Sequence, residues 1–170
     1  IQSTLRQPDR RKEMNEERYA KMLLPYLQES GLIGNSISEE QFIWLKKVVS
    51  LMKSRVRNFR QFVEYADYFF TEDFKIEDDA AEVLKQEGVR ETLIELAKRL
   101  NKLNEWSEEN IEQVVRNIAN EMNLKGRQII HPTRVSLSGK KVGPSLFALM
   151  EALGKDINVS RLKKTANQLS

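Results

Sequence analysis

The chain has 170 residues, of which 40% are hydrophobic and 31% are charged. This length and composition are ordinary for a globular protein with one core or two small ones. No apolar run approaches the ~20 residues that a membrane span needs, and no signal-peptide pattern opens the chain. The lack of cysteine excludes disulfides and thiolate metal sites and is consistent with the cytoplasm. Because the sequence starts with Ile1 rather than Met, we expect it to be part of a longer protein.

The net charge of +3 conceals three blocks of opposite sign. Residues 1–63 carry 12 Lys/Arg against 7 Asp/Glu, and residues 125–170 carry 9 against 2. Residues 64–124, between them, carry 7 Lys/Arg against 16 Asp/Glu. Basic blocks provide the salt-sensitive attraction that a polyanion such as a nucleic acid needs. The same pattern is also typical of charges that only keep a helical protein in solution.

Helical periodicity dominates the rest of the sequence. We expect residues 1–15 to be a linker or a tail, and Pro25 to kink or split the first helix. A capping box over residues 38–41 places the start of the second helix at Glu39, and Ser107 is typical of an N-cap. Helices are predicted over about 16–29, 39–56, 59–70, 80–84, 89–103, 108–122, 144–153 and 158–168.

Residues 134–138 alternate like a short strand, although a helix is also compatible with them, and no other segment alternates. We therefore predict an all-α fold, a helical bundle or cage of two small subdomains, residues 16–70 and 71–170. The apolar residues of the second helix nearly encircle it, which favours heavy burial.

No catalytic or metal site is evident in the sequence. The single histidine, His131, precedes Pro132 in a predicted loop, and with no cysteine it makes a poor zinc site. No phosphate-binding glycine loop occurs. The acidic run 77–79 lacks the ligand spacing of an EF-hand and instead favours a helix N-terminus.

Two motifs carry a resemblance to a known family. Residues 131–155 are HPTRVSLSGKKVGPSLFALMEALGK, and residues 70–74 are FTEDF, preceded at 55–59 by RVRNF. They resemble the C-terminal signature of bacterial glutamyl-tRNA synthetases, in which a P-x-R-x-(A/S)-L-(T/S)-G turn is followed by P-x-L-F and LG-K. The resemblance covers about residues 16–165 and implies an anticodon-binding region.

The resemblance also implies partners and cofactors. The family binds ATP, with Mg²⁺, and glutamate on a catalytic domain with HIGH-like and KMSKS-like loops, and neither loop occurs here. We therefore expect no cofactor on this chain and no aminoacylation by it alone. The implied partners are tRNA(Glu) and the parent catalytic domain. We expect the whole protein to be a cytoplasmic monomer that does not associate with a membrane.

Family members carry an arginine fifteen residues before the phenylalanine of the F-T-E-D element, which here is Arg55. The family uses it to read the third anticodon base, which is C in glutamate anticodons and G in glutamine anticodons. Cytosine offers two adjacent acceptors to a guanidinium, whereas guanine presents an N–H. Without the resemblance, cations at a helix end such as Arg55 and Arg57 are equally explained by the helix dipole.

A second group of residues is implied near the first two anticodon bases. The resemblance assigns this role to Arg134, Gly143, Pro144 and Leu146. Pro144 is also expected at the first position of the next helix. Phosphate or backbone contacts are expected from Lys53, Arg57, Lys140 and Lys141. Aromatic residues among the cations of 41–63 suit base stacking but more often form core.

Three alternatives stay open from the sequence. The main one is a helical protein-interaction or scaffold domain whose acidic block, 64–124, is the working face. A DNA-binding helix-turn-helix is disfavoured because the basic residues do not gather on one recognition helix. A glutaminyl-tRNA synthetase is disfavoured because its anticodon domains are β-barrels.

Overall fold

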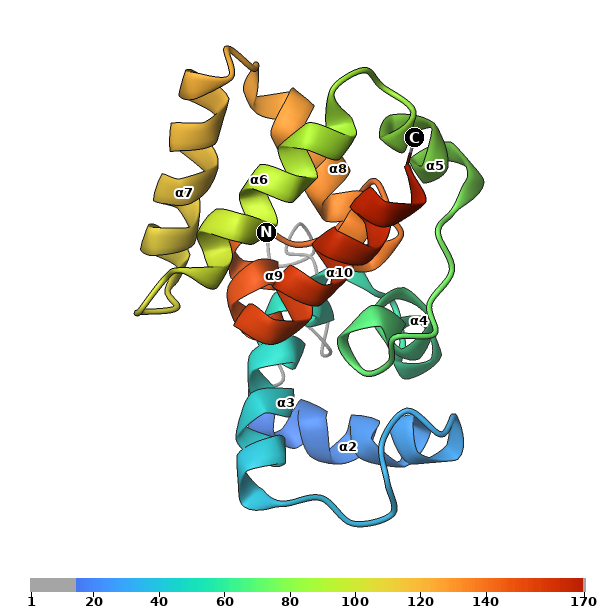
Figure 1. The fold of residues 1–170 in the computed structure, drawn as a ribbon. Helices are drawn as coiled ribbons and strands as arrows, with labels where there is room; N and C mark the ends of the chain where they lie inside the picture. Colours follow the sequence, from blue (N-terminus) through green and yellow to red (C-terminus); the bar gives the residue numbers. More distant parts are fainter. Residues whose placement is uncertain (1–14, 170) are drawn as a thin grey trace, which may run out of the picture. The chain divides into compact units, whose positions relative to one another are not determined.

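The computed structural model describes residues 15–169, so the tail predicted over residues 1–15 lies almost wholly outside the described part. The described residues contain α-helices and short 3₁₀ helices and no strand, which confirms the all-α prediction. The chain divides into two compact units, residues 1–71 and 72–170 (Figure 1). Over residues 15–169, no helix combines the length and apolar character that crossing a bilayer needs.

The first unit is built from three α-helices and two 3₁₀ turns in its described part. They are α2 (Glu16–Glu29), α3 (Glu39–Met52), η2 (Lys53–Arg55), α4 (Phe59–Tyr65) and η3 (Asp67–Phe69). The predicted capping box is present: the Ser38 hydroxyl accepts from the Gln41 N–H at 3.1 Å, and the Gln41 side chain accepts from the Ser38 N–H at 2.8 Å. It satisfies two backbone donors that the helix leaves unpaired, which fixes the start of α3.

Aromatic side chains form much of the first unit's core. The Tyr19 ring meets the edge of Phe59 with ring centroids 5.0 Å apart, and Phe62 is fully buried beside them. Trp44 lies edge-on to Phe70 at 5.4 Å and to Phe69 at 6.5 Å. These contacts join α2 to α4, and α3 to the end of the unit.

Two details of the first unit differ from the prediction, and a third excludes one of two predicted options. Pro25 was predicted to kink or split the first helix, and α2 runs through it without a split; Pro25 is exposed, so water can satisfy the carbonyl that loses its N–H partner. Helix α3 ends at Met52 and continues as the 3₁₀ turn η2. Its burial is one-sided, since Ile43 is 57% exposed.

Over residues 72–169 the second unit contains six α-helices. They are α5 (Asp78–Leu84), α6 (Val89–Asn101), α7 (Glu108–Glu121), α8 (Gly126–Ser138), α9 (Leu146–Leu153) and α10 (Lys155–Gln168). Helix α10 packs along α6, and both contact α8; α7 lies beside α6 and contacts α9 (Figure 1). Ser107 caps α7 as predicted, accepting from the Asn110 N–H at 3.2 Å, and Trp106 donates its indole N–H to the Glu151 carbonyl at 3.3 Å.

Helix α8 is the main correction to the predicted elements. The sequence suggested a loop around His131 and an alternating segment at 134–138, but both are helical, and His131 is exposed on α8. The alternation arose from buried hydroxyls, and three of them bond the carbonyl four residues earlier: Thr133 to Ile129, Ser136 to Pro132 and Ser138 to Arg134. A helix can bury such residues because each hydroxyl finds a partner within it.

Candidate nucleic-acid interface

Arg55 is the last residue of η2, and its side chain is exposed. The backbone beneath it is anchored, because Met52 and Val56 on either side are 3% and 5% exposed. Within residues 15–169 the Arg55 side chain makes no hydrogen bond or ion pair. A fixed backbone with a solvent-exposed guanidinium suits a group that must meet a ligand in one register.

The two neighbouring cations differ in their availability. Arg57 is exposed, and its backbone N–H donates to the Gln61 side chain at 2.8 Å, in the turn where Asn58 caps α4. Lys53, in contrast, forms a 3.1 Å ion pair with Glu16, and its side chain is 15% exposed. The pKa of the Glu16 carboxyl is lowered by its own backbone N–H and then by Lys53. Lys53 is therefore partly neutralised, while Arg57 is available to a phosphate.

The aromatics that interleave with these cations are mostly core. Phe62 is fully buried, and Phe59 packs between Tyr19 and Tyr26, with ring centroids 5.0 and 5.3 Å away. Tyr65, which lies just after the 41–63 segment and suits base stacking in the same way, is 39% exposed.

The second group of predicted residues lies at the α8–α9 loop, residues 139–145. Arg134 is half-buried on α8, and its Nη1 donates to the Pro144 carbonyl at 2.7 Å. Arg134 therefore holds the far end of this loop. The structure places Arg134 against Pro144, which follows Gly143 directly in the chain, and the role of these residues as a shared base-binding site stays a prediction.

The apolar members of this group face inward. Pro144 is buried and Leu146 is 4% exposed. Helix α9 begins at Leu146 after the N-cap Ser145, so Pro144 is not its first residue, contrary to the expectation. The exposed residues of the loop are Lys141, Val142 and Ser145, with Val142 78% exposed, and Gly143 is half-buried. A base approaching this loop would meet its exposed residues first.

The segment that follows the F-T-E-D element braces the near end of the α8–α9 loop. The Glu77 N–H donates to the Gly139 carbonyl at 2.8 Å, and Lys140 Nζ lies 3.2 Å from Glu77 Oε1. Gly139 ends α8 with φ 75°, and a Cβ there would collide with the Lys75 carbonyl. Only glycine combines this conformation with this approach, which explains the glycine that closes the signature turn.

Arg161 of α10 is the buried centre of this region, at 3% exposure. Its Nε lies 2.9 and 3.1 Å from the two Glu72 carboxylate oxygens, and its Nη1 donates to the Leu137 carbonyl at 2.5 Å. The guanidinium also lies over the Phe74 ring, 4.6 Å from its centroid. The sequence analysis assigned no role to Arg161. Its position among the apolar residues that α10 buries was a signal, because an arginine is rarely buried unless it is paired with an acceptor.

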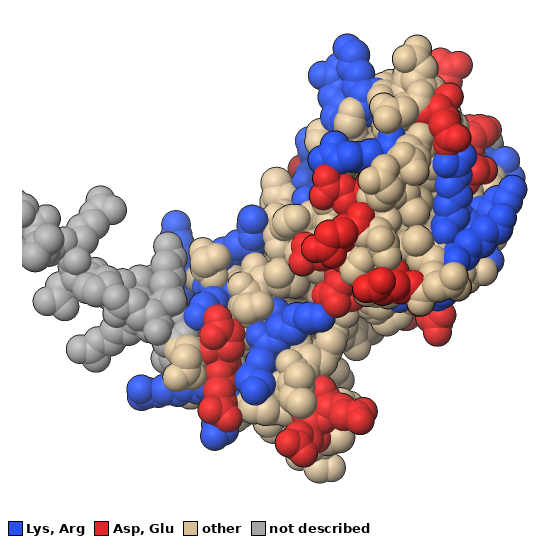
Figure 2. Space-filling view, turned by 90° about the vertical axis from the view of Figure 1, so that its left-hand side faces the viewer, with Lys and Arg blue, Asp and Glu red and all other residues tan. Residues whose placement is uncertain are grey.

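Charges of both signs cover the surface. Figure 2 shows basic and acidic side chains interspersed on the face that it presents, rather than one continuous basic field. Several acidic residues of the 64–124 block pair with neighbouring cations. Arg99 contacts Glu95, with Nε and Oε1 2.8 Å apart, and also Glu121; its hydrogen bond is the main reason that the pKa of Glu95 is lowered. RNA would be attracted by local groups such as Arg55 and Arg57.

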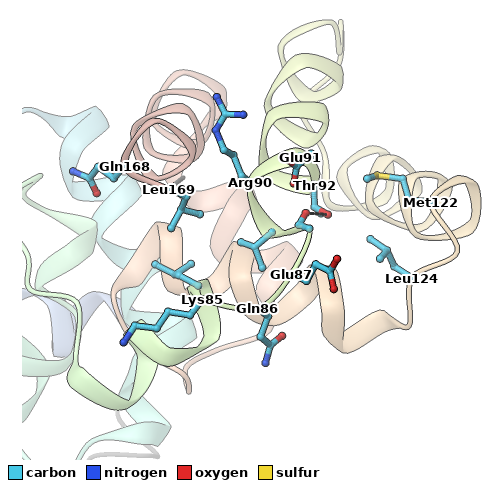
Figure 3. A pocket seen from close by; sticks show the side chains of 13 residues that line it. Lys85, Gln86, Glu87, Arg90, Glu91, Thr92, Met122, Leu124, Gln168 and Leu169 are labelled. Carbon is cyan, nitrogen blue, oxygen red and sulfur yellow. Dashed lines mark hydrogen bonds between the residues drawn. The ribbon is translucent and has the colours of Figure 1, made fainter.

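A pocket of about 840 Å³ lies elsewhere in the second unit, and none of the predicted site residues lines it. It is formed by the turn between α5 and α6, the end of α7 and the end of α10. Figure 3 shows Lys85 and Arg90 extending outward on opposite sides, with Met122 and Leu124 at one end. Among residues 15–169 no group of three His, Asp or Glu side chains could hold a metal ion.

Comparison with known proteins identifies this arrangement. The model of the family described as "Anticodon binding domain" matches residues 18–166. The chain belongs to this family. The domain is 32% identical over 152 residues to the glutamate–tRNA ligase of Bacillus subtilis and 38% identical over 147 residues to glutamate–tRNA ligase 2 of Koribacter versatilis. These alignments cover 89% and 85% of the domain but only 32% and 31% of the relatives.

The fold of this anticodon-binding domain also occurs in solved structures. It matches the glutamate tRNA ligase of Elizabethkingia meningosepticum, in complex with its amino acid, with a TM-score of 0.80 and 23% identity. That match covers 94% of the domain and 30% of the other chain. The domain thus spans about a third of the length of the ligases that it matches, and the comparisons give no support to the scaffold alternative.

Proposed function

We propose that this domain binds the anticodon loop of tRNA(Glu) for a glutamate–tRNA ligase. The observation that carries the proposal is Arg55: an exposed guanidinium on an anchored backbone, in a domain of the anticodon-binding family. The two units then act as two anticodon-binding subdomains. The first reads the third base through Arg55, and the second binds the first two bases at the α8–α9 loop.

Discrimination by Arg55 follows from hydrogen-bond complementarity. A guanidinium donates two parallel N–H groups, and cytosine presents O2 and N3 as adjacent acceptors. Guanine in the same place presents an N–H, so a donor faces a donor and loses its partner. Such a mismatch costs about 1–3 kcal/mol, or about 5- to 150-fold in affinity. Arg55 would therefore separate glutamate anticodons, which end in C, from glutamine anticodons, which end in G.

The other cations contribute without reading sequence. Arg57, Lys140 and Lys141 are placed to neutralise phosphates, while Lys53 must first exchange its Glu16 partner. In the α8–α9 loop, Arg134 orients the backbone while Gly143 allows close approach of a base. Pro144 and Leu146 would support the loop from within, since both are buried.

The decisive experiment measures binding of the 170-residue chain to tRNA with a glutamate anticodon, and to the same tRNA with its third base changed from C to G, at one stated salt concentration. The chain is expected to prefer C by about tenfold. Arg55→Ala should abolish the preference, whereas the matched control Arg57→Ala should weaken binding to both RNAs alike. Equal affinities of the unmodified chain, or an intact preference in Arg55→Ala, would refute the assignment.

The activity of the whole enzyme belongs to the same proposal. We propose that the longer protein attaches glutamate to tRNA with ATP and Mg²⁺ bound on its catalytic domain, as a monomer in the cytoplasm. The isolated chain is then expected to show no glutamate-dependent exchange between ATP and pyrophosphate. Measurable exchange would contradict the placement of catalysis outside this chain.

A further inference from the structure

Arg161 connects three segments that are far apart in the sequence. It bonds Glu72, which lies directly after the first unit, and the Leu137 carbonyl in the last turn of α8. The Phe74 ring covers the face of its guanidinium at 4.6 Å. The planar fork of arginine makes these contacts in different directions at once, which a single lysine ammonium does not.

The same segment then reaches the α8–α9 loop. Five residues after Glu72, the Glu77 N–H bonds the Gly139 carbonyl at 2.8 Å, and the Glu77 carboxylate pairs with Lys140. The Lys140 N–H in turn donates to the Ser138 hydroxyl at 3.1 Å. The backbone at the start of the loop is therefore fixed by a strap, residues 72–77, that Arg161 holds against α8 and α10.

The other end of the loop is held by a separate contact. The Arg134 guanidinium donates to the Pro144 carbonyl at 2.7 Å, so both ends are tied while Lys141 and Val142 between them are exposed. A loop fixed at both ends presents its middle in one conformation and loses less conformational entropy on binding.

We infer that Arg161 and the strap 72–77 are positioning residues for anticodon recognition. Arg161 sets the conformation of the α8–α9 loop and thereby its preference for the first two anticodon bases, although it is buried away from any RNA. This inference rests on the proposed function of that loop. It also explains the F-T-E-D-F motif: Glu72 and Phe74 are in the motif because they hold Arg161.

Arg161→Lys in the 170-residue chain tests the inference, with Arg99→Lys as the control. Arg99 also bonds carboxylates, those of Glu95 and Glu121, but lies outside the strap. Hydrogen exchange is measured at three amides of the brace and of the helix end that it holds. The Glu77 N–H donates to the Gly139 carbonyl, the Lys140 N–H to the Ser138 hydroxyl, and the Gly139 N–H to the Val135 carbonyl at the end of α8. Binding is measured to tRNAs with single changes at each of the three anticodon bases.

In Arg161→Lys the three amides should exchange about tenfold or more faster, and preference at the first two bases should fall by a similar factor. Preference at the third base should persist, because Arg55 lies in the other unit. An unchanged circular dichroism spectrum would report that the second unit of the variant is folded. Arg99→Lys should change neither readout. Glu72→Gln, which keeps the side-chain shape, should give a smaller effect in the same direction.

Unchanged exchange at the three amides in Arg161→Lys would overturn the inference, as would equal loss of preference at all three bases. If the unmodified chain prefers no base, the proposed function fails, and the exchange rates alone decide whether Arg161 holds the loop. If the unmodified chain discriminates normally and Arg161→Lys does so too, the proposed function stands and the positioning role fails.

Discussion

The two units present their candidate RNA-binding groups in different ways. In the first unit the reading group is a single side chain, Arg55, exposed on a 3₁₀ turn whose neighbours are buried. In the second unit the group is a loop, 139–145, whose shape depends on a buried arginine and a strap behind it. The first arrangement separates recognition from stability, because Arg55 can be removed without loss of packing. The second couples them, since the residues that shape the loop also hold the fold.

The largest expected effect on stability is in the second unit, where recognition and stability are coupled, at Gly139. Gly139→Ala places a Cβ against the Lys75 carbonyl in a residue with φ 75°, so the free energy of unfolding should fall by about 2–5 kcal/mol. The control Gly88→Ala has φ 81° but open space around its Cβ, and should lose only about 1–2 kcal/mol. Urea unfolding followed by circular dichroism measures both. Equal losses would show that the close approach to Lys75 is unimportant.

A smaller effect is expected at the cap that starts α3. Ser38→Ala removes the acceptor of the Gln41 N–H and should lower the free energy of unfolding by about 1 kcal/mol. Because the change touches only the helix start, preference for the third anticodon base should stay intact. Loss of that preference in a folded Ser38→Ala variant would contradict the separation of recognition from stability in the first unit.

Two adjacent lysines differ in their partners: Lys140 pairs with Glu77, whereas Lys141 has no ion-pair partner among residues 15–169. Lys141→Ala should weaken binding to all RNAs alike and lower the slope of log affinity against log salt by about one. Lys140→Ala should also act on all RNAs alike, with a smaller change in slope, because Glu77 already neutralises part of its charge. Titrations of tRNA at four salt concentrations measure both slopes. A dependence on anticodon sequence in either variant would contradict a phosphate role.

The smallest effect is expected at Glu16. Its lowered pKa means that the folded state favours the ionised carboxylate, and the ionised carboxylate therefore stabilises the fold. This contribution to the free energy of unfolding is present at a pH above the ordinary pKa of 4.5 and is lost as the pH falls through the lowered pKa. Glu16→Gln should remove that acid dependence and, by removing the carboxylate charge beside Lys53, raise tRNA affinity by about twofold at low salt. Lys53→Gln is the control and should lower the affinity. Unchanged affinity in both would exclude Lys53 from RNA binding.

The sequence predicted the local features of the fold well. The starts of α3 and α7 were evident because Ser38 and Ser107 are cap residues followed by helical apolar patterns. Helix α8 was missed because Pro132 and the alternating hydroxyls of 133–138 imitate a loop and a strand. Their satisfaction by carbonyls of the same helix depends on burial, which a local pattern does not specify.

The candidate site was predictable in part. Arg55 and the residues of the 131–155 signature were found through the family resemblance, and their roles stay predictions. The contact of Arg161 with Glu72 was not foreseen, because it joins residues 89 positions apart and depends on how α10 packs. The pairing of Lys53 with Glu16 was not foreseen for the same reason, because the two residues are also far apart in the sequence. The composition gives the number of charged residues but not which of them form ion pairs.

The two tryptophans allow the unfolding of the two units to be followed separately by fluorescence. The sequence contains two, and one lies in each unit: Trp44 among the rings of Phe69 and Phe70, and Trp106 with its indole N–H on the Glu151 carbonyl. Trp44→Phe and Trp106→Phe would each leave one fluorophore, so the emission of each variant follows the melting of one unit. Coincident transitions would mean that the halves unfold as a single cooperative system, and separate ones that each half is an independent folding domain.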